Sequence, residues 1–210
     1  MNLPGYGRST PAGPSVEDCA DRIAELLEAL RLPRETDVLG NGLGGFIAQA
    51  LAIRHSERFD RLVIVDSLAT FPEPGKGPLR RLARAVQVDG MNAALDAAIQ
   101  RMFPPAYIQA HPEVVEERKQ GLRQIDPQVF AGLCLALTRV NFEPHLAGIR
   151  NPVLVIVGAQ DATTTPALAL KLAEGIPQAR FVEIADSGHC PQIEQPELLV
   201  AQLEAFLPAP

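Results

Sequence analysis

A glycine-rich stretch in the first quarter of the chain has the spacing of a strand-to-helix turn that could present a catalytic group. Residues 38–45 read Val-Leu-Gly-Asn-Gly-Leu-Gly-Gly, with glycine at every second position from Gly40 to Gly44. A turn of the form G-x-S-x-G pushes the side chain of its central residue into the open, and its flanking glycines let strand and helix pass closely. The central residue here is Gly42, which carries no nucleophilic atom.

The same stretch also fits a second chemistry. Gly40, Gly42 and Gly45 have the G-x-G-x-x-G spacing of a dinucleotide-binding turn, in which a helix N-terminus holds a pyrophosphate. Such a site wants an acidic residue at the end of the next strand, and Asp66 ends the next apolar run. The glycine spacing alone therefore favours neither interpretation.

Two polar residues in the last quarter of the chain favour the first interpretation. Asp161 follows the apolar run 153–157, and His189 follows the run 181–184. Both lie just past expected strand ends, where open parallel sheets place their sites. A carboxylate can orient a histidine and stabilise its cation, so that the imidazole acts as a general base. The order glycine turn, acid, histidine is that of a hydrolytic triad, and a dinucleotide site explains neither residue.

Three further residues are candidates for other roles at this site. Asp66 could serve as an alternative acid to Asp161. Cys190 adjoins His189 and could be a displaced nucleophile, although its side chain is expected to point elsewhere. Asn41 could donate a hydrogen bond to a substrate, but a turn residue is the more common role.

The remaining charged residues give weaker signals. A basic run in the middle of the chain is typical of a solvated helix face, although it would suit a carboxylate-bearing substrate; it comprises Arg80, Arg81 and Arg84. The other histidines are expected at the surface or in loops; they are His55, His111 and His145. No histidine pair has metal-ligand spacing, so we predict no metal and no cofactor.

Short apolar runs rich in β-branched residues alternate with helical patterns along the chain. They predict an α/β fold, a mostly parallel sheet covered by helices on both faces. Strands are expected at residues 37–39, 62–65, 153–157 and 181–184. Helices are expected at residues 16–30, after Gly44, and at about residues 197–206. Ser15 and Asp18 resemble a capping arrangement at the start of the first helix.

A long insertion, residues 71–150, separates the second and third expected strands. It is far longer than an ordinary crossover. Its opening, residues 71–78, is rich in Pro and Gly and is expected to be a loop, whereas the rest is helical in pattern with prolines as punctuation. We therefore expect residues 1–70 and 151–210 to form one core, with residues 71–150 as an inserted helical lid. A separate helical domain is the alternative.

Composition narrows the class of protein. The net charge of −6 over 210 residues argues against a nucleic-acid or anionic-membrane surface. No apolar run approaches the ~18 residues that span a bilayer, and the first residues lack a signal-peptide pattern. The cysteines are far apart and odd in number, which favours the reducing cytoplasm over a disulfide framework; they are Cys19, Cys134 and Cys190.

Together these motifs resemble the α/β-hydrolase superfamily along the whole chain. The segments that carry the resemblance are Leu-Pro-Gly-Tyr-Gly-Arg-Ser at 3–9, Gly-Gly-Phe-Ile-Ala-Gln-Ala-Leu-Ala at 44–52, His-Ser-Glu-Arg at 55–58, Gly-Ala-Gln-Asp at 158–161, Gly-His at 188–189 and Glu-Gln-Pro-Glu at 194–197. Within the insertion, the segments 90–91, 103–106 and 111–113 look most like those of 3-oxoadipate enol-lactonases and related small esterases.

The resemblance implies a carboxylic-ester or lactone hydrolase with a Ser-His-Asp mechanism, acting on a small molecule. Position 42 would hold the serine nucleophile, with His189 as base and Asp161 as its orienting acid. The Leu43 backbone N–H would form half of the oxyanion hole. Gly42 departs from this pattern and removes the nucleophile. The alternative expectation is a non-catalytic protein that binds ligands in the remaining pocket.

A second departure concerns the start of the chain. The family would carry about four more strands before Leu3, one of which leads to the loop that supplies the other half of the oxyanion hole. Without them, the strand at residues 37–39 is expected to form an exposed sheet edge. A homodimer could form through that edge.

Overall fold

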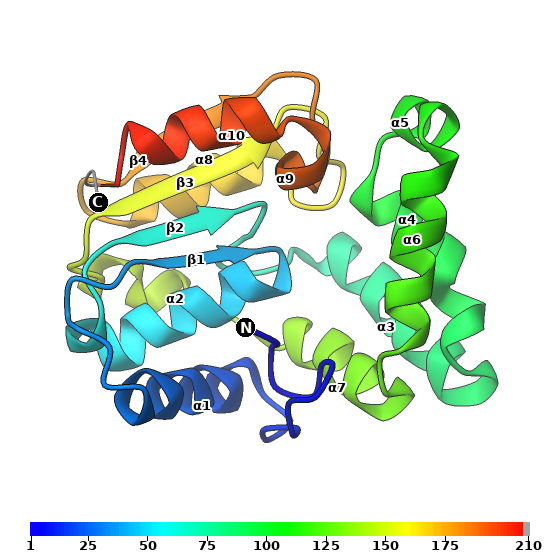
Figure 1. Ribbon diagram of the computed structural model, residues 1–210, viewed down its shortest axis with the longest axis horizontal. Helices are drawn as coiled ribbons and strands as arrows, with labels where there is room; N and C mark the ends of the chain where they lie inside the picture. The colour runs from blue at the N-terminus through cyan, green and yellow to red at the C-terminus, as the bar shows by residue number, and fades with distance from the viewer. Residues whose placement is uncertain (208–210) are drawn as a thin grey trace.

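A four-stranded parallel sheet lies at the centre of the computed structural model (Figure 1). The structure describes residues 1–207; residues 208–210, the end of the expected core, lie outside the described residues. The strands lie side by side in chain order and are β1 (Val38–Asn41), β2 (Leu62–Val65), β3 (Val153–Gly158) and β4 (Arg180–Ile184). Each apolar run predicted as a strand forms one of them, and β1 extends into the glycine stretch as far as Asn41.

All of the strand pairings are parallel, so the carboxyl ends of the strands meet at one edge of the sheet. Leu62 of β2 pairs with Val38 of β1 on one side and with Val153 of β3 on the other. Every residue of β2 and β3 is buried, as expected for parallel strands covered on both faces. In Figure 1 the strand arrows point towards the inserted helices, so this edge faces residues 71–150.

Helices cover both faces of the sheet, which confirms the predicted fold class. On one face, Ile64 and Val155 belong to a hydrophobic cluster that includes Leu172 of α8. On the other face, Ile156 clusters with Leu199 of α10. The helices outside the insertion are α1 (Val16–Ala29), α2 (Leu43–His55), η1 (Ser56–Arg58), α8 (Pro166–Gly175), α9 (Pro191–Glu194) and α10 (Pro196–Glu204).

The first helix has the predicted start. The Ser15 hydroxyl accepts a hydrogen bond from the Asp18 backbone N–H at 3.0 Å, and the Asp18 carboxylate accepts one from the Ser15 N–H at 3.0 Å. This capping box satisfies two donors that would otherwise lack intrahelical partners. The apolar side of α1, including Val16 and Ile23, is buried in the same cluster as α2.

The inserted segment is helical throughout most of its length. Its elements are α3 (Glu73–Asp89), η2 (Met91–Ala94), α4 (Leu95–Met102), α5 (Pro105–Ala110), α6 (Pro112–Arg123), α7 (Pro127–Leu137) and η3 (Glu143–Gly148). Its two ends meet, because Thr70 bridges to Asn141 and the Phe142 N–H donates to the Ala69 carbonyl at 3.0 Å. None of the helices in residues 1–207 is long and apolar enough to cross a bilayer.

The prediction of a loop over residues 71–78 is wrong. Helix α3 already begins at Glu73, with Pro74 in its first turn, where a missing N–H removes no hydrogen bond. Pro78 lies inside the helix, where it removes one backbone hydrogen bond. Burial of Leu79 and Leu82 stabilises α3, which packs against α7, so tertiary packing overrides the local Pro and Gly signals.

Candidate active site

The glycine stretch forms a sharp turn between β1 and α2. Gly42 has φ 54° and ψ −117°, a conformation that a residue with a side chain adopts only under strain. A Cβ atom on Gly40 would overlap the Gly44 carbonyl, so the close approach of strand and helix requires glycine there. By contrast, a Cβ on Gly44 would meet no atom within 4 Å. The expectation that both flanking glycines are sterically required is therefore wrong for Gly44.

Asp161 and His189 lie side by side at the ends of β3 and β4. The His189 Nδ1 atom and the Asp161 Oδ2 atom are 2.8 Å apart. The loops can approach this closely because position 158 lacks a side chain, since a Cβ on Gly158 would overlap the backbone of residues 187 and 188. The sequence thus brings a buried acid and a histidine together across 28 residues.

The Asp161 carboxylate is fully engaged by its own turn. Its Oδ1 accepts the backbone N–H groups of Thr163 and Thr164 at 2.7 and 3.0 Å, and its Oδ2 also accepts the Thr164 hydroxyl. Burial alone would raise the pKa of Asp161, but the hydrogen bond and charge of His189, with the bonds from Thr164, lower it to about 2. Asp161 is therefore ionised at neutral pH and favours a proton on His189 Nδ1.

The histidine faces the glycine turn. A Cβ atom at position 42 would lie 3.0 Å from His189 Nε2, so a side chain there would point at this nitrogen. Within residues 1–207 Nε2 has no hydrogen-bond partner, whereas the backbone of His189 is held at two points. Its carbonyl accepts from Asn41 Nδ2 at 3.2 Å, and its N–H donates to the Met102 carbonyl at 3.1 Å. Asn41 thus contributes to the site through the loop backbone.

Asp66 lies in the same cluster but has the opposite ionisation. It is fully buried, and its Oδ1 accepts the Gly158 N–H at 2.8 Å. Burial and the nearby negative charge of Asp161 raise the pKa of Asp66 to about 9, so its carboxyl is neutral at pH 7. A neutral carboxyl does not stabilise an imidazolium in the way that the Asp161 carboxylate does.

Within residues 1–207, Asp66, Asp161 and His189 are also the one group of three possible metal ligands, with ligand atoms within 4.8 Å of one another. The possible ligand atoms are already engaged or protonated. The Asp161 carboxylate accepts hydrogen bonds from His189 and two backbone N–H groups, and the Asp66 carboxyl is neutral. Metal ligation needs deprotonated carboxylates, so these residues suit a hydrogen-bonded pair better than a cation. Absence of a metal stays a prediction.

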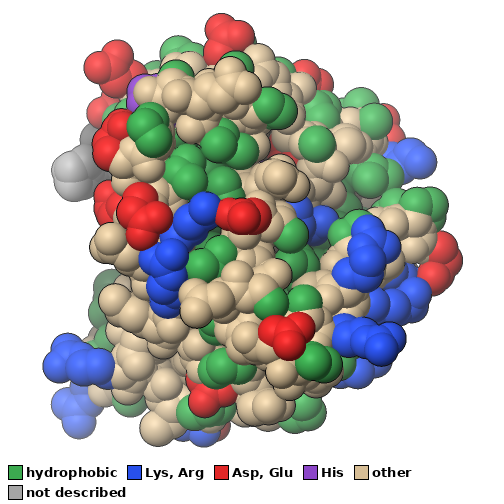
Figure 2. Space-filling view, turned by 90° about the vertical axis from the view of Figure 1, so that its right-hand side faces the viewer, with side chains coloured by type: hydrophobic (Ala, Val, Ile, Leu, Met, Phe, Trp, Pro, Cys, Tyr) green, Lys and Arg blue, Asp and Glu red, His purple; other side chains and the backbone are tan. Residues whose placement is uncertain are grey.

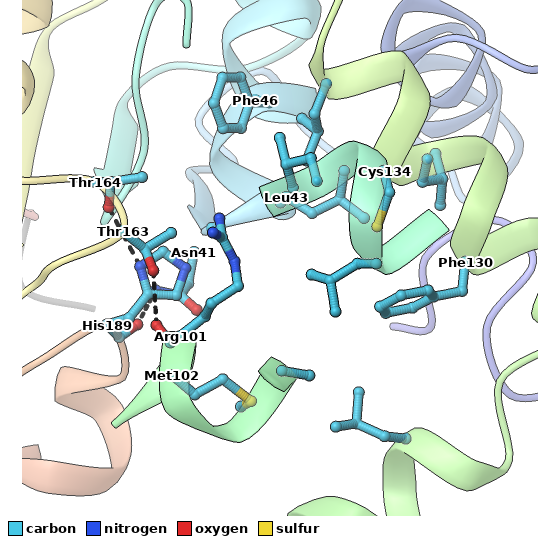
Figure 3. A pocket seen from close by; sticks show the side chains of 18 of the residues that line it. Asn41, Leu43, Phe46, Arg101, Met102, Phe130, Cys134, Thr163, Thr164 and His189 are labelled. Carbon is cyan, nitrogen blue, oxygen red and sulfur yellow. Dashed lines mark hydrogen bonds between the residues drawn. The ribbon is translucent and has the colours of Figure 1, made fainter. Parts of the chain in front are cut away.

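A pocket of about 360 Å³ lies between this cluster and the inserted helices (Figure 3). Leu43, the first residue of α2, and Gly42 contribute to its floor, and His189 lies at one end. The inserted helices supply most of the remaining lining, which is apolar apart from one arginine; this lining comprises Leu79, Leu82, Ala98, Arg101, Met102, Leu122, Phe130, Leu133, Cys134 and Leu137.

Several other candidates lie away from this chemistry. His55 pairs with Asp21 at 2.7 Å, and His111 lies 3.5 Å from Glu113 at the surface. His145 is exposed on η3 and does not line the pocket. The arginines of α3 are exposed, and basic side chains gather on the outer surface of the inserted helices with acidic ones among them (Figure 2); these arginines are Arg80, Arg81 and Arg84.

Cys190 lines the pocket but is unsuited to act as a nucleophile. It is buried in a hydrophobic cluster with Ile99 and Phe103. Burial, and then the negative charge of Glu194, raise the pKa of Cys190 far above its ordinary value. The reactive form of cysteine is the thiolate, so this thiol is inert at neutral pH.

Thr163, Thr164 and Arg101 belong to the site but were not predicted from the sequence. An Asp followed two and three residues later by threonines is a signal of a turn in which the carboxylate accepts backbone N–H groups, so the two threonines could have been found. Arg101 carries no such local signal, because its place in the pocket depends on how α4 packs.

Comparisons with known proteins agree with this architecture. The profile of the alpha/beta hydrolase family matches residues 1–202. The chain is 33% identical over 205 residues to 3-oxoadipate enol-lactonase 2 of Acinetobacter baylyi, an alignment that covers 97% of this chain and 75% of that protein. It superposes on a thermophilic esterase from Thermogutta terrifontis with a TM-score of 0.88, at 31% identity over 98% of this chain and 77% of the esterase. The enol-lactonase from Burkholderia xenovorans LB400 gives a TM-score of 0.88 at 29% identity, covering 98% and 78% of the two chains.

Proposed function

Because this chain belongs to the α/β-hydrolase family, we propose that it is a protein of the carboxylic-ester or lactone hydrolase type whose pocket binds a small ester or lactone. The observation that carries the proposal is the geometry at Gly42. A Cβ at that position would lie 3.0 Å from His189 Nε2, in the strained backbone conformation that a nucleophile elbow imposes on its central residue. A hydroxyl attached there would be within reach of a base backed by an ionised carboxylate.

The proposal assigns one role to each group at the end of the sheet. His189 Nε2 acts as the general base, and Asp161 orients the imidazole and stabilises its cation. The Leu43 N–H donates to the oxyanion that forms on the substrate carbonyl. Asp66, neutral at pH 7, is a supporting residue that holds the Gly158 backbone. Residues 71–150 act as a lid over the bound ligand.

Gly42 determines how fast this chain reacts. With a serine at position 42, its oxygen bonds to the substrate carbonyl carbon, His189 takes the hydroxyl proton, and the alcohol leaves with that proton. Water then hydrolyses the acyl-enzyme with His189 again as base. Glycine offers no oxygen at position 42, so in this chain His189 Nε2 activates water instead. We therefore assign the present chain slow hydrolysis without an acyl-enzyme.

The test compares serine, alanine and the original glycine at position 42. Gly42→Ser is expected to give p-nitrophenyl acetate turnover with a burst of p-nitrophenol equal to the enzyme concentration. Gly42→Ala is the matched control, because it adds the same Cβ beside His189 without a hydroxyl. Fast turnover in the unmodified Gly42 protein that survives His189→Ala would contradict the proposed roles.

A second candidate function follows from the same glycine. A protein with an intact apolar pocket and no nucleophile at position 42 can serve as a binding protein for the same class of ligand. In that case esters or lactones raise the melting temperature of the chain without being turned over. Measurable hydrolysis that requires His189 would favour the catalytic function instead.

We also propose that the open edge of β1 pairs with the same edge of a second copy, giving a homodimer in the cytoplasm. Among the described strands, β1 pairs with β2 alone, and its Leu39 is 48% exposed. Unpaired strand edges with apolar side chains are templates for pairing. The described cysteines are free and buried, which fits a reducing compartment. Light scattering tests the dimer: Leu39→Lys should give a monomer, and a monomer in the unmodified protein would overturn it.

A further inference from the structure

We propose that the ligand of this pocket carries a carboxylate in addition to its ester or lactone bond, and that Arg101 binds this carboxylate. The inference rests on the proposed function, because it names the kind of ester or lactone that the pocket accepts. No part of it requires a nucleophile at position 42, so it can be tested by binding alone.

Arg101 is the one permanent charge among the described residues that line the pocket. It lies in the last turn of α4, and Figure 3 shows its guanidinium directed into the pocket on the side of Asn41 and Leu43. The walls around it are largely apolar, with Phe46 and Leu133 among them. The charge pattern therefore fits a ligand with an apolar body and a single negative group.

The guanidinium has no anionic partner within residues 1–207. Burial lowers the pKa of Arg101, but arginine remains charged at neutral pH. The Asp161 carboxylate is taken up by His189 and the turn that follows it. The Cys134 thiol is neutral, because burial raises its pKa to about 12. A partly desolvated cation without a counter-charge is unfavourable, and a ligand carboxylate would relieve this.

The backbone that carries Arg101 is fixed relative to the reacting groups. The Arg101 carbonyl accepts a hydrogen bond from the Thr163 hydroxyl at 2.9 Å, and the adjacent Met102 carbonyl accepts the His189 N–H at 3.1 Å. The end of α4 is thus fastened to both the acid loop and the histidine loop. A carboxylate held by Arg101 would set the position of the remaining ligand with respect to His189.

The chemistry of the side chain points to a carboxylate rather than to a neutral polar group. A guanidinium offers a planar fork of N–H donors that matches the two oxygens of a carboxylate, and it has no acceptor for a donor group on the ligand. The arginines of α3 are exposed and face solvent, where ion pairs contribute little. Arg101 is the arginine whose surroundings make such a bond strong.

The experiment measures binding of matched esters to the protein with Gly42 in place. Isothermal titration calorimetry compares monomethyl glutarate with dimethyl glutarate, and the suberate pair in the same way. The monoester is expected to bind at least about tenfold more tightly than the diester, as for hydrogen bonds between charged groups. Arg101→Gln should abolish this preference and Arg101→Lys should retain part of it. Arg84→Gln, at an exposed position of α3, should leave it unchanged.

Each result decides the assignment. Equal affinity for monoester and diester in both pairs, or a preference that survives Arg101→Gln, overturns the role of Arg101. Failure of both monoesters to bind at millimolar concentration overturns it as well. These results leave the proposed function to its own test, the gain of turnover in Gly42→Ser. If Arg101→Gln lowers the melting temperature, Arg101→Lys, which keeps the charge, still decides between carboxylate binding and loss of fold.

Discussion

The two walls of the pocket differ in how they are held. The wall formed by the carboxyl ends of the strands consists of polar groups that are hydrogen-bonded to one another: Asp161 to His189 and Thr164, and Asn41 to the His189 carbonyl. The wall formed by the inserted helices consists of apolar side chains around Arg101. Groups that transfer protons must be positioned to a few tenths of an ångström, whereas a wall that selects ligands requires only shape and charge.

The two walls also differ in how tightly their backbones are packed. Gly158 and Gly40 allow backbone to contact backbone at the strand ends, so that wall cannot shift without moving the sheet. The opposite wall is joined to it through a few bonds, such as that from Thr163 to Arg101. We therefore expect substitutions in the first wall to affect rate and folding, and substitutions in the second wall to affect which ligands bind.

The largest expected effect separates the two walls by function. In a Gly42→Ser background, His189→Ala should lower p-nitrophenyl acetate turnover by about 10³-fold or more, because it removes the base. Arg101→Gln should change turnover of this neutral ester by less than about tenfold, since the ester has no carboxylate to bind. Steady-state kinetics of the two double variants measures both. Equal losses of turnover in the two double variants would show that catalysis and ligand selection are not separated between the two walls.

A second expected effect separates two glycines of one turn. Gly40→Ala should lower the free energy of unfolding by about 3 kcal/mol, because its Cβ would overlap a backbone carbonyl that cannot move. Gly44→Ala should raise it by about 0.5–1 kcal/mol, because position 44 is helical and open. Urea denaturation gives both values. A strong loss in Gly44→Ala would show that the turn is tighter than described.

The third expected effect concerns Asp66 and pH. Its folded pKa of about 9 lies above the ordinary value of 3.8, so the folded chain holds a proton that the unfolded chain releases between these values. The stability linked to this proton is complete below about pH 4 and is lost as the pH rises towards 9, by up to about 1.4 kcal/mol per pH unit. Asp66→Asn mimics the neutral acid, so it should be more stable than the unmodified chain at pH 8 by at least about 2 kcal/mol.

Denaturation at pH 5 and pH 8 measures the difference in slope. The exposed Asp89→Asn serves as the control for removing one negative charge, and it should keep the slope of the unmodified chain. If Asp66→Asn loses stability equally at both pH values, Asp66 is ionised in the folded protein and the description of a neutral carboxyl beside Asp161 is wrong.

The smallest expected effect compares two adjacent threonines. Thr164→Val removes the hydroxyl that donates to Asp161, so in the Gly42→Ser background it should lower turnover about tenfold. Thr163→Val removes a hydroxyl that bonds to the opposite wall at Arg101, and turnover of a neutral ester should change less than about threefold. A larger loss of turnover in Thr163→Val than in Thr164→Val would show that the Thr164 hydroxyl does not support Asp161 as described.

Much of the first wall could be predicted from the sequence, because its signals are local. Apolar runs mark the strands, and the turns after them carry Gly42, Asp161 and His189. Parallel strands bring those turns to one edge whatever the rest of the chain does. The threonines after Asp161 were missed although their spacing was visible.

The second wall could not be predicted at the same level. Arg101 lies on a helix whose direction depends on packing against other helices, and nothing in the residues around it indicates a pocket. The exposed arginines of α3 form the more conspicuous sequence pattern, yet they face solvent. The prediction of a loop at the start of α3 was also wrong, because burial of Leu79 and Leu82 outweighs the proline and glycine signals before them.

The central claim is that a hydroxyl at position 42 would lie against His189 Nε2, and covalent labelling tests it most directly. Phenylmethanesulfonyl fluoride is added to Gly42→Ser, and intact mass and peptide mapping locate the label. We predict one sulfonyl group per chain on the introduced serine. The serine oxygen bonds to sulfur, fluoride leaves, and the proton of the serine hydroxyl passes to His189. We predict no label in Gly42→Ala or in Gly42→Ser with His189→Ala. Labelling of Gly42→Ser that is undiminished when His189 is replaced, or no labelling of a folded Gly42→Ser, would contradict the account.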